Sequence, residues 1–118
     1  MSLTVRALTK EADQRAAWRL LNDCLAYDRF TWTEFQRKTV GDPGYREGLF
    51  LGAYRGSELL GAMAGVLRGE SPGAECNLKT FGVRKESRGQ GVGSLLLSRL
   101  EETVRDRGAT SVQMRGNF

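Results

Sequence analysis

The chain has 118 residues, of which 40% are apolar and 27% are charged, a composition typical of one small globular domain rather than a disordered or fibrous protein. Its net charge of +4 is too small and too evenly spread to indicate a nucleic-acid-binding protein. The sequence contains no histidine, which excludes the Ser-His-Asp and Cys-His nucleophile arrangements and the commonest metal ligand, so we expect no bound metal.

The first part of the chain predicts one strand followed by two helices. Residues 3–8 alternate between apolar and polar side chains, as in a short strand. Apolar residues then recur at three- and four-residue spacing, which predicts an amphipathic helix over roughly 10–26. A second, weaker helical pattern covers about 31–39, with Thr31 or Thr33 as its N-terminal cap.

The second part predicts three strands, a helix and a last strand. Strand patterns at 49–54 and 59–67 flank a short turn and indicate a hairpin, and a further strand covers 74–83. An amphipathic helix over about 91–107 precedes a strand at 110–115. The predicted order is β-α-α-β-β-β-α-β in a single domain of residues 1–118. We expect an α/β (α+β) fold whose mixed, mostly antiparallel sheet is flanked by helices.

The cysteines bear on disulfide and metal binding, and the apolar segments bear on the cellular location. Cys24 and Cys76 are too few for a disulfide framework or a zinc site, so both are predicted to be buried free thiols. The first residues lack the apolar run of a secretory signal, and no later apolar stretch is long enough to cross a bilayer. We therefore predict a cytoplasmic protein without a membrane partner.

A glycine-rich segment, Arg88-Gly89-Gln90-Gly91-Val92-Gly93-Ser94, connects a predicted strand to a predicted helix. Glycine lets the backbone approach a ligand closely, and the first N–H groups of a helix have no partner within it. Together with the helix dipole, these groups form a site for a phosphate. Arg84, Lys85 and Arg88 add positive charge. The alternative interpretation is a glycine-rich turn that binds no ligand.

Two common phosphate-binding motifs do not fit this segment. A Walker A loop needs a lysine immediately before the Ser or Thr, and no lysine precedes Ser94. A dinucleotide fingerprint needs G-x-G-x-x-G near the start of a parallel sheet, whereas here G-x-G-x-G follows four strands that look antiparallel. Nucleoside triphosphates and dinucleotides are therefore disfavoured.

The segment resembles the acyl-CoA-binding motif of the GNAT acetyltransferases. Arg88-Gly89-Gln90-Gly91-Val92-Gly93 fits that family's [Q/R]-x-x-G-x-[G/A] signature in full, and Phe81-Gly82-Val83 looks like the end of its fourth strand. The similarity in element order covers residues 3–116, and it is specific over about 78–115.

The resemblance implies an N-acetyltransferase that moves an acetyl group from acetyl-CoA to a primary amine by direct attack in a ternary complex. Backbone N–H groups of residues 90–94 would hold the CoA pyrophosphate. The backbone around Phe81 and Val83 would bond to the pantetheine arm and polarise the thioester carbonyl. The residues expected to bind CoA are Phe81, Gly82, Val83, Arg88, Gly89, Gln90, Gly91, Val92, Gly93 and Ser94.

Glu75 is the predicted general base, because related enzymes often use a carboxylate on this strand. Its parity matches that of Phe81 and Val83, so the three share one face of the strand if no bulge intervenes. The alternative is a solvated carboxylate at the strand end. The acceptor is a small-molecule or peptide amine, and the residues predicted to contact it, or alternatively to pack between helices, are Tyr27, Phe30 and Trp32.

The C-terminal end departs from the family pattern. Members usually continue with an Asn-containing loop, a helix bearing a Tyr that acts as general acid, and further strands. Here Asn117 falls near the expected asparagine and no Tyr follows. The chain is then a fragment, a protein completed by a partner, or a non-catalytic CoA-binding or assembly module. We favour a fragment, because the last strand would otherwise leave an open sheet edge, which could also pair in a homodimer.

Overall fold

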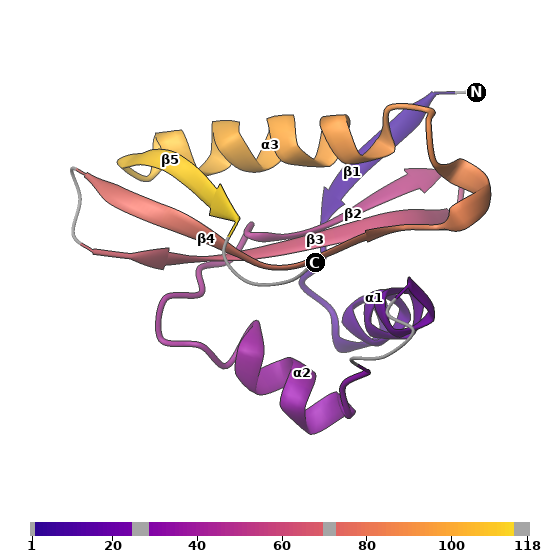
Figure 1. Ribbon diagram of the computed structural model, residues 1–118, viewed down its shortest axis with the longest axis horizontal. Coiled ribbons are helices and arrows are strands. Elements are labelled where there is room, and N and C mark those ends of the chain that lie inside the picture. Colours follow the sequence, from indigo (N-terminus) through magenta and orange to yellow (C-terminus); the bar gives the residue numbers. More distant parts are fainter. Residues whose placement is uncertain (1, 25–28, 70–72, 115–118) are drawn as a thin grey trace.

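The computed structural model describes residues 2–24, 29–69 and 73–114 (Figure 1). The element order is the predicted one, with a short 3-10 helix, η1, that the sequence pattern did not indicate. The elements are β1 (Leu3–Ala7), α1 (Glu11–Cys24), α2 (Trp32–Lys38), β2 (Phe50–Arg55), β3 (Glu58–Arg68), β4 (Ala74–Val83), η1 (Lys85–Ser87), α3 (Val92–Asp106) and β5 (Ala109–Met114).

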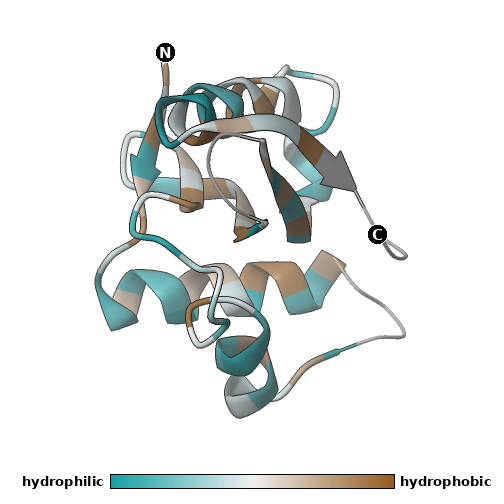
Figure 2. Ribbon diagram, turned by 90° about the vertical axis from the view of Figure 1, so that its left-hand side faces the viewer, coloured by the Kyte–Doolittle hydropathy of each residue, from teal (hydrophilic) through white to brown (hydrophobic). Residues whose placement is uncertain are grey.

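The five strands form one sheet in the order β1-β2-β3-β4-β5. The first four are antiparallel, and β5 lies parallel to β4 after the crossover through α3. The helix α3 covers one face of the sheet, and α1 and α2 cover the other (Figures 1 and 2). In the part of the chain that the structure describes, β5 pairs with β4 alone. Dimerisation through its outer edge stays a prediction.

Each face of the sheet has its own hydrophobic core. On the α3 face, Leu96 and Leu100 are fully buried against the strands. On the other face, Leu21 and Phe35 anchor α1 and α2. Thr31 caps α2 in a reciprocal capping box, as the sequence predicted. None of the helices in the described ranges has the length and apolar character that a membrane crossing requires.

A bulge in β4 changes the face on which its side chains lie. Ala64 of β3 stands opposite Thr80, but the next residue, Gly65, stands opposite Leu78. Lys79 is therefore an extra residue in β4. A bulge of this kind reverses the inward and outward alternation of the side chains that follow it.

The bulge makes the expected position of Glu75 wrong. Before it, Cys76 and Leu78 pack in the α3 core; after it, Phe81 and Val83 do. Neighbouring side chains of a strand lie on opposite faces, so Glu75, next to Cys76, lies on the α1 face of β4. Phe81 and Val83 lie on the other face, which α3 covers. The parity argument failed because it assumed a regular strand.

The two thiols lie in different environments. Cys76 is completely buried, as predicted, and burial raises its pKa to about 11. Cys24 is a free thiol, as predicted, but the prediction that it is buried was wrong: it is only partly buried, and its Sγ lies 3.5 Å from the Val83 carbonyl oxygen, beside a cavity. Within the described ranges, no group of three or more His, Cys, Asp or Glu side chains could hold a metal ion.

An ion pair between Asp42, in the loop after α2, and Arg68, at the end of β3, connects these two segments. Both terminal nitrogens of Arg68 donate to the Asp42 carboxylate at 2.7 Å, and the Gly44 N–H donates to the same group at 2.7 Å. These bonds favour the charged carboxylate and hold the pKa of Asp42 at about 2, below its ordinary value of 3.8.

The Asp42–Arg68 ion pair should make the free energy of unfolding depend on pH. A lowered folded-state pKa adds stability that is complete above pH 5 and is lost as the pH falls through 3.8 toward 2. We expect Asp42→Asn to cost about 1–2 kcal/mol at pH 7, a figure reduced from the full shift because the Arg68 side chain is 42% exposed. Urea unfolding between pH 2 and pH 7 tests this. An equal pH slope in the two proteins would contradict the assignment.

Candidate functional site

The glycine-rich segment after β4 has the backbone conformation that its sequence suggested. Gly89 has φ of 81° and Gly91, the N-terminal cap of α3, has φ of 82°. Residues with a Cβ rarely adopt this left-handed region. A Cβ on either glycine would meet no atom within 4 Å, so conformation rather than lack of space requires glycine here.

The N-terminus of α3 is left without a capping side chain. The Leu95 N–H donates to the Gly91 carbonyl at 3.0 Å and begins the helical bonding. The N–H groups of Val92, Gly93 and Ser94 precede it and have no partner within the helix. With the positive end of the helix dipole, they form a site for an anion.

These N–H groups lie at a cavity of about 540 Å³ between β4, the glycine-rich segment and α3. Every residue predicted to bind CoA lines it except Gln90. The Gln90 Oε1 instead accepts a bond from Arg55 Nη2 at 2.7 Å, which ties the segment to the end of β2. The lining residues are Cys24, Phe81, Gly82, Val83, Ser87, Arg88, Gly89, Gly91, Val92, Gly93 and Ser94.

Beside this cavity, one edge of β4 has no paired strand among the residues that the structure describes. The Arg84 N–H donates to the Leu60 carbonyl of β3 at 2.8 Å. Because N–H groups alternate along a strand, those of Phe81 and Val83 point to the opposite edge. Pairing with β5 reaches only Leu78 within the described residues. An extended ligand can therefore bond to β4 as an added strand would.

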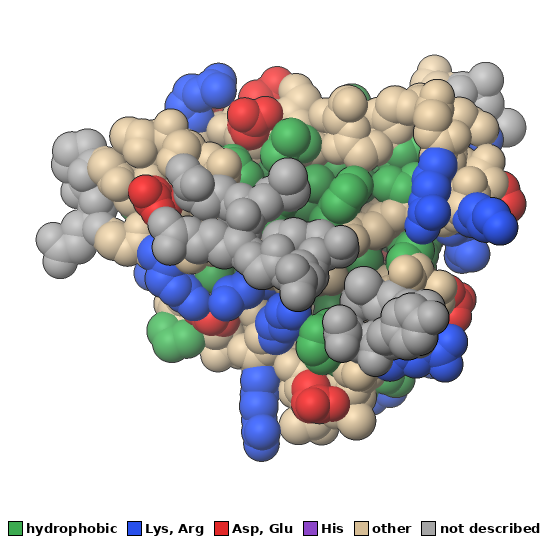
Figure 3. Space-filling view, in the orientation of Figure 1, with side chains coloured by type: hydrophobic (Ala, Val, Ile, Leu, Met, Phe, Trp, Pro, Cys, Tyr) green, Lys and Arg blue, Asp and Glu red, His purple; other side chains and the backbone are tan. Residues whose placement is uncertain are grey.

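Basic side chains lie at this end of the molecule (Figure 3). Arg88 lines the cavity, and its Nε donates to the Val83 carbonyl at 3.2 Å. Arg84 and Lys85 line an adjoining hollow of about 270 Å³, which Arg88 and Cys24 share with the main cavity. Asp23 and Glu86 line the adjoining hollow as well, so the positive charge that favours an anionic ligand comes from Arg88 in the main cavity.

Sequence reasoning missed two residues of the cavity and the role of one glycine. Ser87 is buried beside the motif, and Cys24 reaches the cavity from the end of α1. Cys24 is 59 positions from Val83 in sequence, so no local pattern could have placed it there. A Cβ on Gly93 would stand 3.0 Å from the Phe81 ring, so this glycine lets α3 pack closely on β4.

The predicted base does not line the cavity. Glu75 is partly buried on the α1 face of β4. Asn77, which lies on the same face two residues nearer Phe81, was not singled out from the sequence. Its Oδ1 is buried and has no hydrogen-bond partner within the described part of the chain. A buried amide oxygen of this kind has an unused capacity to accept a bond from an N–H group.

The aromatic residues between α1 and α2 pack rather than line the cavity. The Phe30 carbonyl accepts bonds from Trp18 Nε1 at 2.8 Å and Asn22 Nδ2 at 2.9 Å. The Trp32 ring meets the Trp18 ring edge-on, with centroids 5.6 Å apart. Tyr27 lies outside the described residues. Contact of these three residues with an acceptor stays a prediction.

Comparison with known proteins gives one family and several structures of the same fold. The model of the acetyltransferase (GNAT) family matches residues 8–117. No curated protein matches the chain by sequence. An aminoglycoside acetyltransferase from an uncultured soil metagenomic sample aligns with a TM-score of 0.76 at 20% identity, over 99% of this chain and 81% of that one.

Two further structures align over most of their length. The ribosomal-protein-S18-alanine N-acetyltransferase of Escherichia coli has a TM-score of 0.74 at 18% identity, over 96% of this chain and 66% of its own. Arabidopsis thaliana Naa50, in complex with the bisubstrate analogue CoA-Ac-MVNAL, has a TM-score of 0.69 at 20% identity, over 97% and 70%. At these identities the likeness shows a shared fold.

Proposed function

The chain belongs to the acetyltransferase (GNAT) family, and on this premise we propose that it transfers an acetyl group from acetyl-CoA to a primary amine. The amine attacks directly in a ternary complex, without a covalent enzyme intermediate. The observation that carries the proposal is the 540 Å³ cavity, where the glycine-rich segment, the uncapped start of α3 and the open edge of β4 meet.

The cavity offers separate partners for two parts of CoA, the pyrophosphate and the pantetheine arm. The N–H groups of residues 92–94 and the guanidinium of Arg88 suit the pyrophosphate. The pantetheine arm then runs along β4, where the N–H groups of Phe81 and Val83 point away from β3. The Naa50 structure, which was solved with a CoA bisubstrate analogue, supports acetyl-CoA as the donor.

The chemistry follows from where the thioester would lie. The N–H of Phe81 or Val83 donates to the thioester carbonyl and stabilises the oxyanion that forms when the amine attacks. The carbon–sulfur bond then breaks, CoA leaves as the thiolate, and this thiolate takes a proton from solvent water. Six residues of strand, at most about 20 Å, separate Glu75 from Phe81, so the ammonium proton reaches Glu75 through a chain of several water molecules rather than by direct contact.

The acceptor approaches from the α1 face in this arrangement. Asn77 lies between Glu75 and the open edge, and its buried Oδ1 can accept a bond from the amine. Phe30 and Trp32 border the same side of the sheet and would contact the rest of the acceptor. Two proteins of the same fold, an aminoglycoside acetyltransferase and the ribosomal-protein-S18-alanine N-acetyltransferase, support an amine acceptor without selecting one amine.

Titration of acetyl-CoA into the purified chain, followed by an assay of CoA release with a panel of amines, tests the proposal. We expect micromolar binding and release of CoA that depends on the amine. Binding without turnover on any amine would favour the alternative, a non-catalytic CoA-binding or assembly module. A folded chain that binds no acetyl-CoA would contradict both the transferase and the CoA-binding module, and would leave only an assembly module.

Replacing Glu75 with glutamine tests the base. We expect kcat to fall about 100-fold or more with acetyl-CoA binding unchanged, because glutamine cannot take the ammonium proton. Glu58→Gln, at an exposed carboxylate beside the hairpin turn, is the matched control and should keep the wild-type rate. An unchanged kcat in Glu75→Gln would remove Glu75 as the base.

A further inference from the structure

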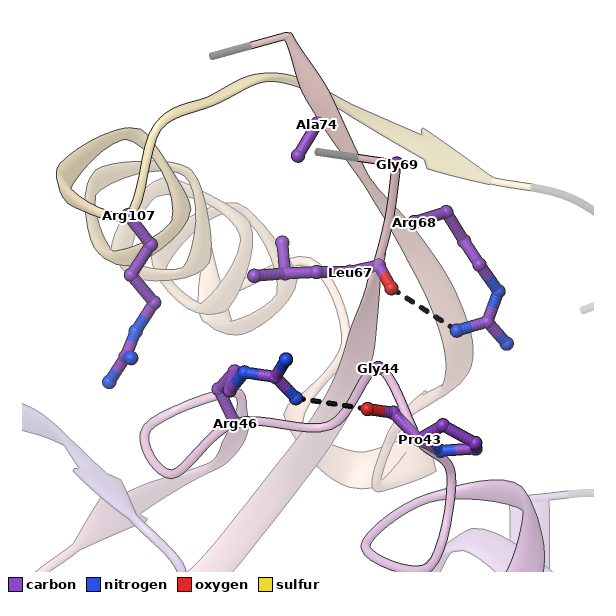
Figure 4. Close-up of a pocket in the computed structure, with 8 residues that line it drawn as sticks. All are labelled: Pro43, Gly44, Arg46, Leu67, Arg68, Gly69, Ala74 and Arg107. Carbon is purple, nitrogen blue, oxygen red and sulfur yellow. Dashed lines mark hydrogen bonds between the residues drawn. The ribbon is translucent and has the colours of Figure 1, made fainter. Parts of the chain in front are cut away.

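A second basic cavity lies at the other end of the sheet (Figure 4). It has a volume of about 660 Å³, between the loop after α2, the end of β3, the start of β4 and the end of α3. The ten residues of β4 separate it from the glycine-rich segment by roughly 30 Å. Its lining residues are Pro43, Gly44, Arg46, Leu67, Arg68, Gly69, Ala74 and Arg107.

Three arginines reach this cavity from three sides (Figure 4). Arg46 comes from the loop after α2, Arg68 from the end of β3, and Arg107 from the residue that follows α3. They are at least 22 positions apart in sequence, so only the fold brings them together. Gathering like charges at one cavity is unfavourable unless anions compensate them.

Only one of these guanidiniums is paired with a carboxylate in the described part of the chain, that of Arg68. Arg46 Nη1 donates to the carbonyls of Pro43 and Tyr45 at 3.0 and 2.8 Å. Arg107 Nη2 donates to the carbonyl of Glu47 at 2.5 Å. A guanidinium has five N–H donors, so Arg46 and Arg107 each keep donors for a further anion.

The loop that forms the floor of the cavity is held in place. The Gly44 carbonyl accepts a bond from the Leu67 N–H at 2.7 Å. A Cβ on Gly44 would overlap the Leu67 carbonyl oxygen, so the loop touches β3 backbone to backbone. With the Asp42–Arg68 pair, these contacts fix the position of the loop that lines the cavity.

We propose that this cavity binds a small anion carrying a phosphate or carboxylate group, at a site separate from the acyl-CoA cavity. The forked guanidiniums of Arg46 and Arg107 match the geometry of both groups. The volume falls within the usual range of small-molecule pockets, about 300–1,000 Å³. Leu67 and Ala74 provide apolar surface for the body of the ligand.

Amide chemical shifts of the ¹⁵N-labelled chain, followed while inorganic phosphate or, separately, citrate is added, test this site. We expect saturable shifts at residues 44–46, 67–69 and 107. The double variant Arg46→Gln/Arg107→Gln should weaken them about tenfold or more, since both charged donors are lost. Comparing the two probes distinguishes a phosphate site from a carboxylate site.

The matched control is Arg19→Gln/Arg37→Gln, which removes the same charge at two exposed helix positions. It should leave the affinity unchanged. The proposal would be overturned if the anions shifted only the amide signals of residues 87–94. It would also be overturned if the control variant lost as much anion affinity as the test variant. If the double variant does not fold, the single variants Arg46→Lys and Arg107→Lys replace it. Each keeps the positive charge but removes the forked guanidinium, and an unchanged anion affinity in both would also overturn the proposal.

Discussion

Replacing Gly91 with tryptophan is expected to abolish acetyl-CoA binding while the chain remains folded. Gly91 has φ of 82°, which costs a residue with a side chain about 1–2 kcal/mol. Its missing side chain faces open space beside the first N–H groups of α3, and an indole there would occupy the place of the pyrophosphate. We expect Kd for acetyl-CoA to rise about 100-fold or more, since about 2.7 kcal/mol of binding free energy would be lost.

Calorimetric titration measures this effect, and Ser98→Trp provides the matched control. Ser98 is exposed on the same helix, away from the cavity. Its variant should bind acetyl-CoA as the wild type does. Equal binding by folded Gly91→Trp would show that the segment does not hold CoA. Phosphate shifts at residues 44–46 should persist in Gly91→Trp, which separates the two anion sites.

Phe35→Ala should cause the largest loss of stability, about 3–5 kcal/mol. Phe35 is 1% exposed, and its ring lies 5.7 Å from that of Phe50 and 6.0 Å from that of Trp32. The helix α2 has seven residues, too few to be stable alone, so this side chain attaches it to the sheet. Urea unfolding at pH 7 measures the change.

Phe30→Ala is the control for the Phe35 experiment. Phe30 is only partly buried, and Lys38 Nζ lies 4.2 Å from its ring centre. Its removal should cost clearly less than that of Phe35. If Phe35→Ala costs under about 1 kcal/mol, α2 is not anchored through the core on this face, and the packing described for that core is wrong.

The sequence predicted the helices well because their signals are local. The capping box at Thr31 and Glu34 lies within four residues, and so does the repeat of apolar residues that marks α3. The left-handed glycines at 89 and 91 are also local, since their backbone conformation excludes most other residues. The glycine-rich segment and the start of α3 were therefore identified from the chain alone.

The face of β4 on which Glu75 lies could be found only from the tertiary structure. The extra residue of β4, Lys79, has no sequence feature that marks a bulge, and the bulge exists only as a register between β3 and β4. One extra residue moves each side chain beyond it to the other face of the sheet. For this reason a correct strand prediction still placed Glu75 on the wrong face.

By itself the sequence determined the order of the elements, the glycine-rich segment and the family resemblance, because each depends on residues that are neighbours in the chain. The tertiary structure alone decided that Cys24 borders the cavity proposed for acetyl-CoA and that Arg46, Arg68 and Arg107 line a second one. Those sites form where distant elements pack on opposite ends of one sheet. Packing of this kind depends on the shape of the whole core, which no short pattern encodes.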